Sequence, residues 1–199
     1  MALSDRDVMN FRLIFPFKLR CIAPSGGGKS FLVRKIIEQR KEIIDKPIDR
    51  VIYFFTQWQS IFDEMKAADP NIIFTDRIED VDALVENPCI IIFDDCLQSL
   101  NKGNPIYDVV TRYFLRSAHH LGCCVCLLLQ IAFGPGLRIL NLNSDYVAYF
   151  QNRRDSSSFQ CLARQVGGGQ TRFLLDAYKR STENKPFSYL FCDFHPRNK

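Results

Sequence analysis

Short apolar runs alternate with longer amphipathic segments over most of the chain. The runs are bounded by polar or turn residues, and several of them are apolar at consecutive positions. This is typical of strands buried on both faces of a parallel sheet. The expected strands are residues 18–23, 51–56, 72–75, 89–94, 123–130, 146–151 and 189–194.

The segments between these runs have helical periodicity. Residues 30–44 place Val33, Ile36, Ile37 and Ile44 on one face, as expected for a helix that covers a sheet. The other expected helices are residues 57–68, 106–120 and 162–181, the last in two pieces broken by Gly167, Gly168 and Gly169. The alternation of strands and helices predicts an α/β fold with a largely parallel central sheet flanked by helices.

The 199 residues suffice for one such domain and are too few for two ordinary enzyme domains. We therefore expect a single domain over residues 1–199. It would have an N-terminal extension at 1–12, and a C-terminal helical segment with a closing strand at 155–199. No apolar run approaches the ~18 residues of a membrane span, and no secretory signal is evident at the start. The net charge of +4 is compatible with nucleic acid as a partner but does not demand it.

Most of the eight cysteines lie in the apolar runs, where cysteine behaves as a small hydrophobic residue. Together with the missing secretory signal, this predicts a reducing compartment. Cys123 and Cys126 have C-x-x-C spacing, but no second Cys or His pair stands at zinc-ligand spacing. We interpret this pair as part of a core strand.

A phosphate-binding loop follows the first expected strand and opens the first expected helix. Its sequence is APSGGGKS at residues 23–30. The glycines let backbone N–H groups approach phosphate oxygens, and the helix start adds further donors. Lys29 would reach the β- and γ-phosphates and Ser30 would hold Mg²⁺. Ala23 replaces the usual first glycine, so that end of the loop must adopt a conformation that a methyl group tolerates. The expected nucleotide contacts are Pro24, Ser25, Gly26, Gly27, Gly28, Lys29, Ser30 and Phe31.

Two further strands end in polar residues at the edge where ligands of parallel sheets gather. Residues 89–94 lead into the carboxylates Asp94 and Asp95. Asp94 is expected to hold Mg²⁺ and Asp95 to act as general base on the attacking water. Residues 123–130 end in Gln130, which would detect the γ-phosphate or orient water. The chemistry predicted from these motifs is hydrolysis of ATP.

The ordered set of motifs resembles the FtsK–HerA superfamily of P-loop ATPases. More narrowly, it resembles the poxvirus-type genome-packaging ATPases of large DNA viruses, virophages and Maverick/Polinton or adintovirus-like elements. The resemblance covers roughly residues 17–197. The motifs are APSGGGKS at 23–30, IIFDD at 91–95, RSAHH at 116–120 leading to Gln130, LRILNLN at 137–143 and KPFSYLFCD at 185–193.

The resemblance implies a RecA/FtsK-like ATPase core that pumps double-stranded DNA into a preformed capsid. It implies ATP and Mg²⁺ as cofactors, a homo-oligomeric ring of five or six subunits, and capsid proteins at the packaging vertex as partners. The protein would be intracellular, in the host nucleus or a cytoplasmic virus factory, and transiently at the virion vertex. A neighbouring subunit would supply an arginine finger, for which Arg116 is the first candidate. The further candidates are Arg112, Arg153 and Arg154. The chain departs from the group in two places: Asp95 stands where many members have Glu, and SAH at 117–119 where packaging members have Gly-Arg-His.

A DNA motor needs positive charge toward the duplex but no base readout. Lys102, in the loop after the acidic pair, could couple DNA contact to the nucleotide state. The other candidate contacts are Arg153, Arg154, Arg164, Arg172, Lys179 and Arg180.

Two other readings stay open. A small nucleotide or metabolite kinase would need an arginine-rich lid, and the chain from 101 to 120 contains only Arg112 and Arg116. A nucleotide-gated assembly protein with little turnover would keep Lys29 and Ser30 but lose the hydrolytic carboxylate. Asn104 replaces the Asp of the Asn-Lys-x-Asp motif, which argues against GTP specificity.

Overall fold

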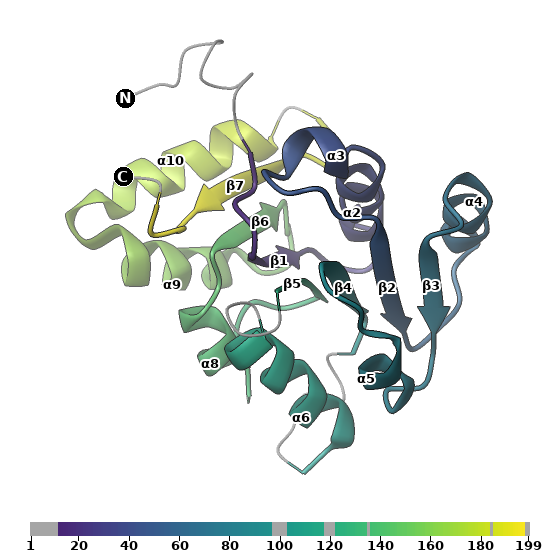
Figure 1. Cartoon of the computed structure of the whole chain (residues 1–199). Coiled ribbons are helices and arrows are strands. Elements are labelled where there is room, and N and C mark those ends of the chain that lie inside the picture. The colour runs from purple at the N-terminus through teal and green to yellow at the C-terminus, as the bar shows by residue number, and fades with distance from the viewer. Residues whose placement is uncertain (1–11, 97–102, 118–121, 135, 184, 198–199) are drawn as a thin grey trace.

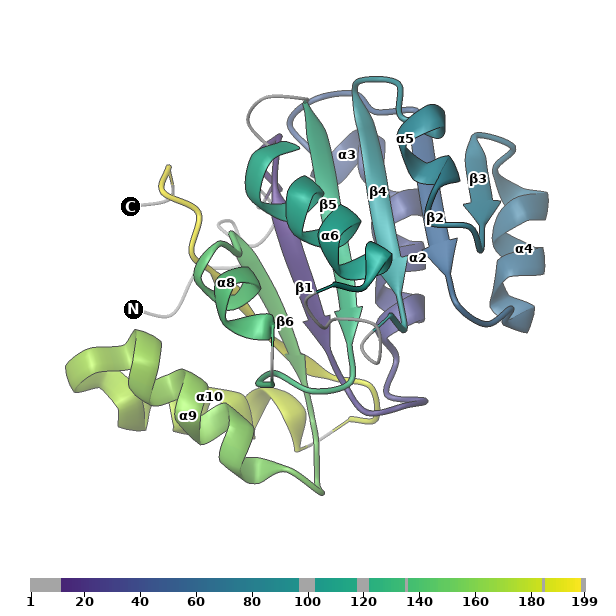
Figure 2. The same cartoon turned by 90° about the horizontal axis from the view of Figure 1, so that it is seen from below.

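One sheet runs through the computed structural model, which describes residues 12–96, 103–117, 122–134, 136–183 and 185–197. Among these residues, seven strands form the sheet in the order β3-β2-β4-β5-β1-β6-β7 (Figures 1 and 2). All neighbouring pairs are parallel except β6 and β7, which are antiparallel. The strands are β1 (Lys18–Ile22), β2 (Arg50–Phe55), β3 (Ile72–Thr75), β4 (Cys89–Asp94), β5 (Cys123–Leu129), β6 (Tyr146–Phe150) and β7 (Tyr189–Asp193).

The predicted α/β architecture is therefore confirmed, and each expected strand is present with ends that differ by one residue at most. The reason is burial. Strands β4 and β5 are buried at every position, as their uninterrupted apolar sequences require. Successive side chains of β5 point to opposite faces, so Cys123 and Cys126 belong to different core clusters. This confirms the interpretation of the C-x-x-C spacing as core strand.

Helices cover both faces of the sheet (Figure 2). One face packs against α2 (Lys29–Glu38) and α4 (Ser60–Ala68). The other packs against α6 (Pro105–Arg112), the π-helical turn η2 (Tyr113–Ser117) and α8 (Leu137–Leu142). The helices α3 (Arg40–Ile43) and α5 (Asp80–Leu84) are single short turns. The remaining helices, α9 (Ser156–Gly167) and α10 (Thr171–Thr182), are joined by the 3₁₀ turn η3 (Gly168–Gln170).

The first predicted helix is interrupted where one long run was expected. The predicted helix 30–44 is divided into α2 and α3, which are separated at Gln39 and end at Ile43. Arg40 turns inward there and donates to the carbonyls of Ile37 and Ile48 at 2.8 and 2.7 Å. Ile44 is buried as expected, but it bridges Leu13 from outside the helix.

The other helix boundaries differ for local reasons. Helix α4 begins at Ser60 and not at 57, because Gln59 before it has an extended backbone, with φ −126° and ψ 145°. Helix α6 begins after Asn104, whose side chain accepts a hydrogen bond from the Ile106 backbone N–H at 2.9 Å. The last part of the predicted helix 106–120, residues 118–120, lies outside the described residues.

The C-terminal helices form a hairpin, α9–α10, which extends from the β6–β7 end of the sheet (Figure 2). The predicted start at residue 162 was wrong: α9 begins at Ser156, because Asp155 accepts a hydrogen bond from the Ser158 backbone N–H at 3.0 Å and caps it. The predicted break at the glycines is confirmed, since Gly168 has φ +47°. None of the described helices is long and apolar enough to cross a bilayer.

Candidate nucleotide-binding site

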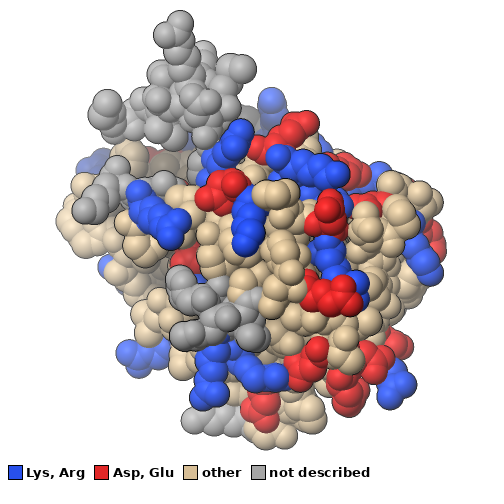
Figure 3. All heavy atoms as spheres, in the orientation of Figure 1, with Lys and Arg blue, Asp and Glu red and all other residues tan. Residues whose placement is uncertain are grey.

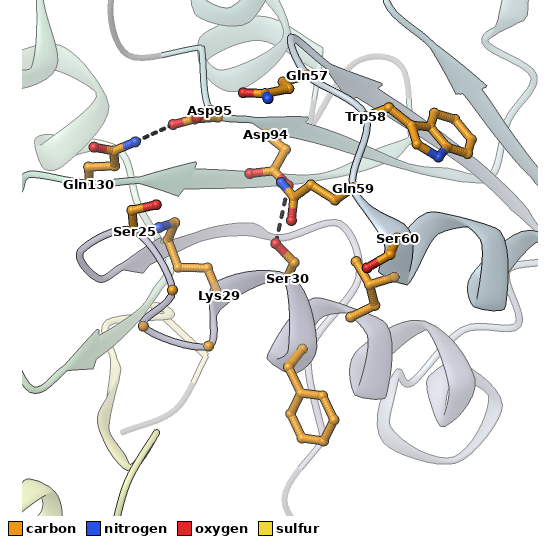
Figure 4. A pocket seen from close by; sticks show the side chains of 15 residues that line it. Ser25, Lys29, Ser30, Gln57, Trp58, Gln59, Ser60, Asp94, Asp95 and Gln130 are labelled. Atoms are coloured by element: carbon orange, nitrogen blue, oxygen red, sulfur yellow. Dashed lines mark hydrogen bonds between the residues drawn. The ribbon is translucent and has the colours of Figure 1, made fainter.

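The carboxyl edge of the parallel strands brings together the three sequence motifs (Figure 4). Strand β5 lies between β1, which leads into the glycine loop, and β4, which leads into the acidic pair. A cavity of about 450 Å³ opens at this edge. It is lined by Ser25, Gly26, Gly27, Gly28, Lys29, Ser30, Phe31, Gln57, Trp58, Gln59, Ser60, Ile61, Asp94, Asp95 and Gln130.

The loop before α2 is tightly folded on itself. The Gly27 backbone N–H donates to the Pro24 carbonyl at 2.9 Å, and a Cβ added at Gly27 would lie 2.7 Å from the Cβ of Ala23. The methyl group of Ala23 is thus accommodated by the bare face of Gly27. Gly28 has φ +98° and precedes the first turn of α2, so free N–H donors of the helix start open into the cavity. This loop, which we call the cradle, lines the cavity with glycine backbone, as an anion site requires.

Lys29 lies at the bottom of the cradle, with 8% of its surface exposed. Its Nζ donates to the carbonyls of Ala23 and Pro24 at 2.9 and 3.2 Å. Burial lowers the pKa of Lys29, and the nearby carboxylates of Asp94 and Asp95 offset part of this effect. The Lys29 ammonium lines the same cavity as the carboxylates of Asp94 and Asp95.

Asp94 is almost fully buried and is surrounded by donors. Its Oδ2 accepts from the Tyr53 hydroxyl at 2.8 Å, from Ser30 Oγ at 3.3 Å and from Gln59 Nε2 at 3.5 Å. Burial raises the pKa of Asp94, although the hydrogen bond from Tyr53 and the charge of Lys29 both act to lower it. Ser30 Oγ and Asp94 Oδ2 thus lie side by side at the cavity, where they could hold a cation.

Asp95 and Gln130 contact each other across the gap between β4 and β5. The Gln130 amide donates to Asp95 Oδ1 at 2.5 Å. Asp95 has φ +53°, a left-handed conformation that non-glycine residues rarely adopt. Its carbonyl accepts from Thr56 Oγ1 at 3.2 Å. Strain of this kind is kept only where neighbouring structure enforces it, and it gathers at functional sites.

Sequence reasoning missed one side of the cavity. Residues 57–59 follow the carboxyl end of β2, and Tyr53 reaches the acidic pair from within that strand. The signal was present, because the rule that ligands gather at carboxyl ends applies to β2 as it does to β4. Trp58 packs edge-on against Phe55 and Phe62, with ring centroids 5.3 and 5.5 Å away.

The candidate finger arginines lie in two places. Arg116 is exposed on η2, just before the amino end of β5, whereas Gln130 follows its carboxyl end. At a rise of about 3.3 Å per residue, the length of β5 puts roughly 20 Å between these two edges. Arg112 is bound to Asp82 through two contacts of 2.7 and 3.0 Å. Arg153 and Arg154 follow β6, at the same edge as the glycine loop.

The predicted DNA contacts are mostly exposed on the α9–α10 hairpin. Arg164, Arg172, Lys179 and Arg180 are exposed there, and Lys179 pairs with Glu183 at 3.7 Å. Basic and acidic side chains are interspersed over the face seen in Figure 3. Lys102 lies outside the described residues.

No protein-family model and no curated protein sequence matches this chain. Solved structures do match in fold. The genome packaging NTPase B204 from Sulfolobus turreted icosahedral virus 2, in complex with AMPPCP, gives a TM-score of 0.60 at 14% identity over 90% of this chain and 93% of that chain. B204, the DNA-packaging ATPase from Sulfolobus turreted icosahedral virus, gives 0.59 at 13% identity with the same coverage. ATPases 2 and 3 of Thermomonospora curvata EccC, in complex with a signal sequence peptide, give 0.51 at 14% identity over 71% of this chain and 31% of that chain.

At these identities the likeness concerns the fold. It confirms the predicted resemblance at that level: the chain has the fold of P-loop ATPases, a viral genome-packaging NTPase among them.

Proposed function

We propose that this chain is an ATP-hydrolysing motor that moves double-stranded DNA into a preformed capsid. The observation that carries the proposal is the convergence of three groups on one cavity: the glycine loop, the Ser30–Asp94 pair and the Asp95–Gln130 pair. The three groups come from the carboxyl ends of β1, β4 and β5, and together they would supply phosphate binding, metal ligands and water activation.

The phosphate and metal ligands fit nucleotide and Mg²⁺. The loop N–H groups and Lys29 would bind the β- and γ-phosphates. Ser30 Oγ and Asp94 Oδ2, now 3.3 Å apart, are the hard oxygen donors that Mg²⁺ takes beside phosphate. Bound there, the ion would neutralise charge on the phosphate oxygens. Tyr53 and Gln59 would hold the Asp94 carboxylate in place.

Asp95 and Gln130 are the proposed hydrolytic pair. Gln130 donates to one carboxylate oxygen of Asp95, which orients the side chain. The other oxygen would accept a proton from water as that water attacks the γ-phosphorus. A kinase would have to exclude that water, so a carboxylate and an amide aimed at the cavity favour hydrolysis over transfer to an acceptor.

The arginine finger would come from a neighbouring subunit. Arg116 lies at the edge of the sheet opposite to the site of its own chain, so it cannot serve that site. In a homo-oligomeric ring of five or six subunits it would meet the site of the next chain, with Arg153 and Arg154 as alternatives. Each site would then be complete only in the ring.

DNA would be held through its phosphates by the basic residues of the α9–α10 hairpin, together with Lys102, Arg153 and Arg154. The hairpin, residues 156–183, carries four basic and two acidic side chains. The names of the B204 structures, a DNA-packaging ATPase and a genome packaging NTPase, support DNA as the substrate. The motor would act in an infected host cell, in the nucleus or a cytoplasmic virus factory, and would meet capsid proteins at the packaging vertex.

The test is steady-state ATP hydrolysis at low salt, with and without linear double-stranded DNA. Turnover should rise with DNA, fall as salt is added, and vanish in Lys29→Ala. Lys35→Ala is the matched control, because Lys35 is an exposed lysine on the same helix. Turnover that ignores DNA would refute the motor. Phosphate transfer only to an added acceptor would favour the kinase, and binding without turnover the nucleotide-gated assembly protein.

The finger is tested by mixing two inactive variants. Arg116→Ala keeps its own hydrolytic pair, and Asp95→Ala keeps its arginine. If the finger acts across a subunit boundary, the mixture should recover part of the wild-type turnover that neither variant shows alone. No recovery in the mixture, or full activity of Arg116→Ala alone, would exclude Arg116 as the finger.

A further inference from the structure

An exposed phenylalanine stands beside the glycine loop without any part in the site described so far. Phe187 has 63% of its surface exposed, and its backbone has φ +62°. Together with Asp95 it is one of two non-glycine residues with positive φ among the described residues. Two features of Phe187 cost free energy: the exposure of its apolar ring to water and the left-handed conformation of its backbone. The contacts of Phe187 within the chain offset little of this cost.

The turn that carries Phe187 is firmly held. Ser188 Oγ donates to the Lys185 carbonyl at 2.6 Å and lies 3.3 Å from the Thr182 carbonyl, which ties the turn to the end of α10. On its other side, Tyr189 begins β7 opposite Phe150, with their rings 4.9 Å apart. The ring of Phe187 is therefore presented from a fixed turn.

The antiparallel direction of β7 decides where this turn lies. Because β7 runs against β6, its amino end pairs with the carboxyl end of β6, at the edge that carries the glycine loop. A Cβ added at Gly28 would meet Phe187 Cβ and Cδ1 at 3.2 Å each, and Phe150 Cε1 at 3.3 Å. Phe187 thus packs directly on the last glycine of the phosphate-binding loop.

Phe187 and the hydrolytic groups lie on opposite sides of that loop. Asp94, Asp95 and Gln130 lie at the ends of strands β4 and β5, on one side of β1, whereas Phe187 precedes β7, on the β6–β7 side. A nucleotide triphosphate is linear, with the reacting γ-phosphate at one end and the nucleoside at the other. When the γ-phosphate faces the hydrolytic pair, the nucleoside leaves the loop toward β6 and β7.

We propose that Phe187 is the platform on which the nucleotide base stacks. A flat apolar ring beside the phosphate site offers a base a π-face, and stacking of this kind tolerates different bases. The inference rests on the proposed function only in that nucleotide phosphates occupy the loop. It also gives the strained turn and the exposed ring a function.

Two exposed aromatic residues line the cavity itself, Phe31 and Trp58, but they are less suited to hold the base. Phe31 is 51% exposed, but Lys35 Nζ already lies 4.9 Å from its ring centroid, on the side of α2. Trp58 packs edge-on against Phe62 and Phe74, on the β2–β3 side of the proposed metal ligands. A base there would put the nucleoside, and not the γ-phosphate, toward Asp94.

The test compares a ligand that has a base with one that lacks it. ADP and inorganic pyrophosphate share the diphosphate, so calorimetric titration of each in Mg²⁺ buffer isolates the base. Phe187→Ala should raise the Kd for ADP by about tenfold, as expected for one lost stacking contact, and should leave the Kd for pyrophosphate unchanged. Phe187→Trp should keep the ADP affinity. Phe173→Ala is the matched control, because Phe173 is 60% exposed, does not line the cavity and lies in the first turn of α10, whereas the turn with Phe187 is tied to the last.

Three results would overturn the inference: an unchanged ADP affinity in Phe187→Ala, an equal loss of ADP and pyrophosphate, or a selective loss of ADP in Phe31→Ala instead. Lys29→Ala separates this failure from a failure of the proposed function. If Lys29→Ala binds both ligands as tightly as wild type does, the phosphate site itself is wrong. If it loses both while Phe187→Ala loses neither, only the base platform is refuted.

Discussion

Removing the Tyr53 hydroxyl is the sharpest test of the proposed metal site. Its oxygen lies 2.8 Å from Asp94 Oδ2. Both residues are buried, since Tyr53 is 0% exposed and Asp94 is 2% exposed. A hydrogen bond to a charged group contributes about 1.5–3 kcal/mol, and about 1.4 kcal/mol is a factor of ten. If the bond stabilises the ionised ligand, Tyr53→Phe should need roughly 10- to 100-fold more Mg²⁺ for half-maximal ATP hydrolysis.

The pH dependence gives the direction of the effect. Burial raises the pKa of Asp94 and the Tyr53 hydrogen bond lowers it, so the variant should have a still higher pKa. A carboxyl with a higher pKa is protonated over a wider acid range. The acid limb of the activity profile should therefore move to higher pH, and the Mg²⁺ deficit should shrink as the pH is raised.

The assay is a Mg²⁺ titration of hydrolysis at several pH values, with Tyr178→Phe as the control. Tyr178 also loses a hydroxyl that donates to protein, at 3.0 Å to the Phe150 carbonyl, but it lies on α10 and makes no contact with Asp94. An unchanged Mg²⁺ requirement in Tyr53→Phe would refute the reasoning. So would a similar change in both variants, since that would point to general loosening of the fold.

Three further outcomes are expected. Asp94→Asn should abolish hydrolysis yet raise the melting temperature, by about 2–4 °C for each kcal/mol of desolvation cost removed. Because the folded pKa of Asp94 is raised, this gain should be full above that pKa and vanish as the pH falls below about 4. Gly27→Ala should lose nucleotide binding, because its Cβ would lie 2.7 Å from Ala23 Cβ and 2.8 Å from the Pro24 carbonyl. A thiol reagent should modify Cys161 quickly in the native protein, because it is the exposed one of the eight cysteines.

Each of these three expectations can be contradicted by a specific result. A melting temperature of Asp94→Asn at or below that of wild type at pH 7 would show that the carboxylate stabilises the fold. Gly26→Ala is the control for the loop, because an added Cβ there meets nothing within 4 Å although its φ is +71°. Equal binding losses at both glycines would point to backbone strain and not to collision. Fast modification of Cys21 would contradict its burial, which raises the pKa of its thiol to about 12.

The parts of the molecule that could be predicted are those whose residues are neighbours in the sequence. The glycine loop, Lys29 and Ser30 are contiguous, and Asp94 follows an apolar strand that fits only the middle of a sheet. These features need no knowledge of which strands are neighbours. Strand positions were predictable for the same reason, since burial on both faces leaves a continuous apolar run.

The parts that could not be predicted depend on partners far apart in the chain. From the sequence alone, Tyr53 is an ordinary core residue of a strand. Only the pairing of β2 with β4 places its hydroxyl beside Asp94. Phe187 lies at the loop only because β7 runs antiparallel to β6. The start of α9 was a different case, because Asp155 and Ser158 form a capping pattern that the sequence itself contained.

The strand order also sets when the site can form. Strand β1 pairs with residues more than a hundred positions later: Leu19 lies opposite Cys126 in β5 and Tyr146 in β6. Loop closure over such separations is slow, and these contacts need the C-terminal half of the chain. A nascent chain that has exposed only its first half therefore carries the glycine loop without the strands that shape it. We expect ATP binding to begin only after β5 and β6 have been synthesised, so that nucleotide stabilises chains in which the whole sheet has formed and not shorter ones.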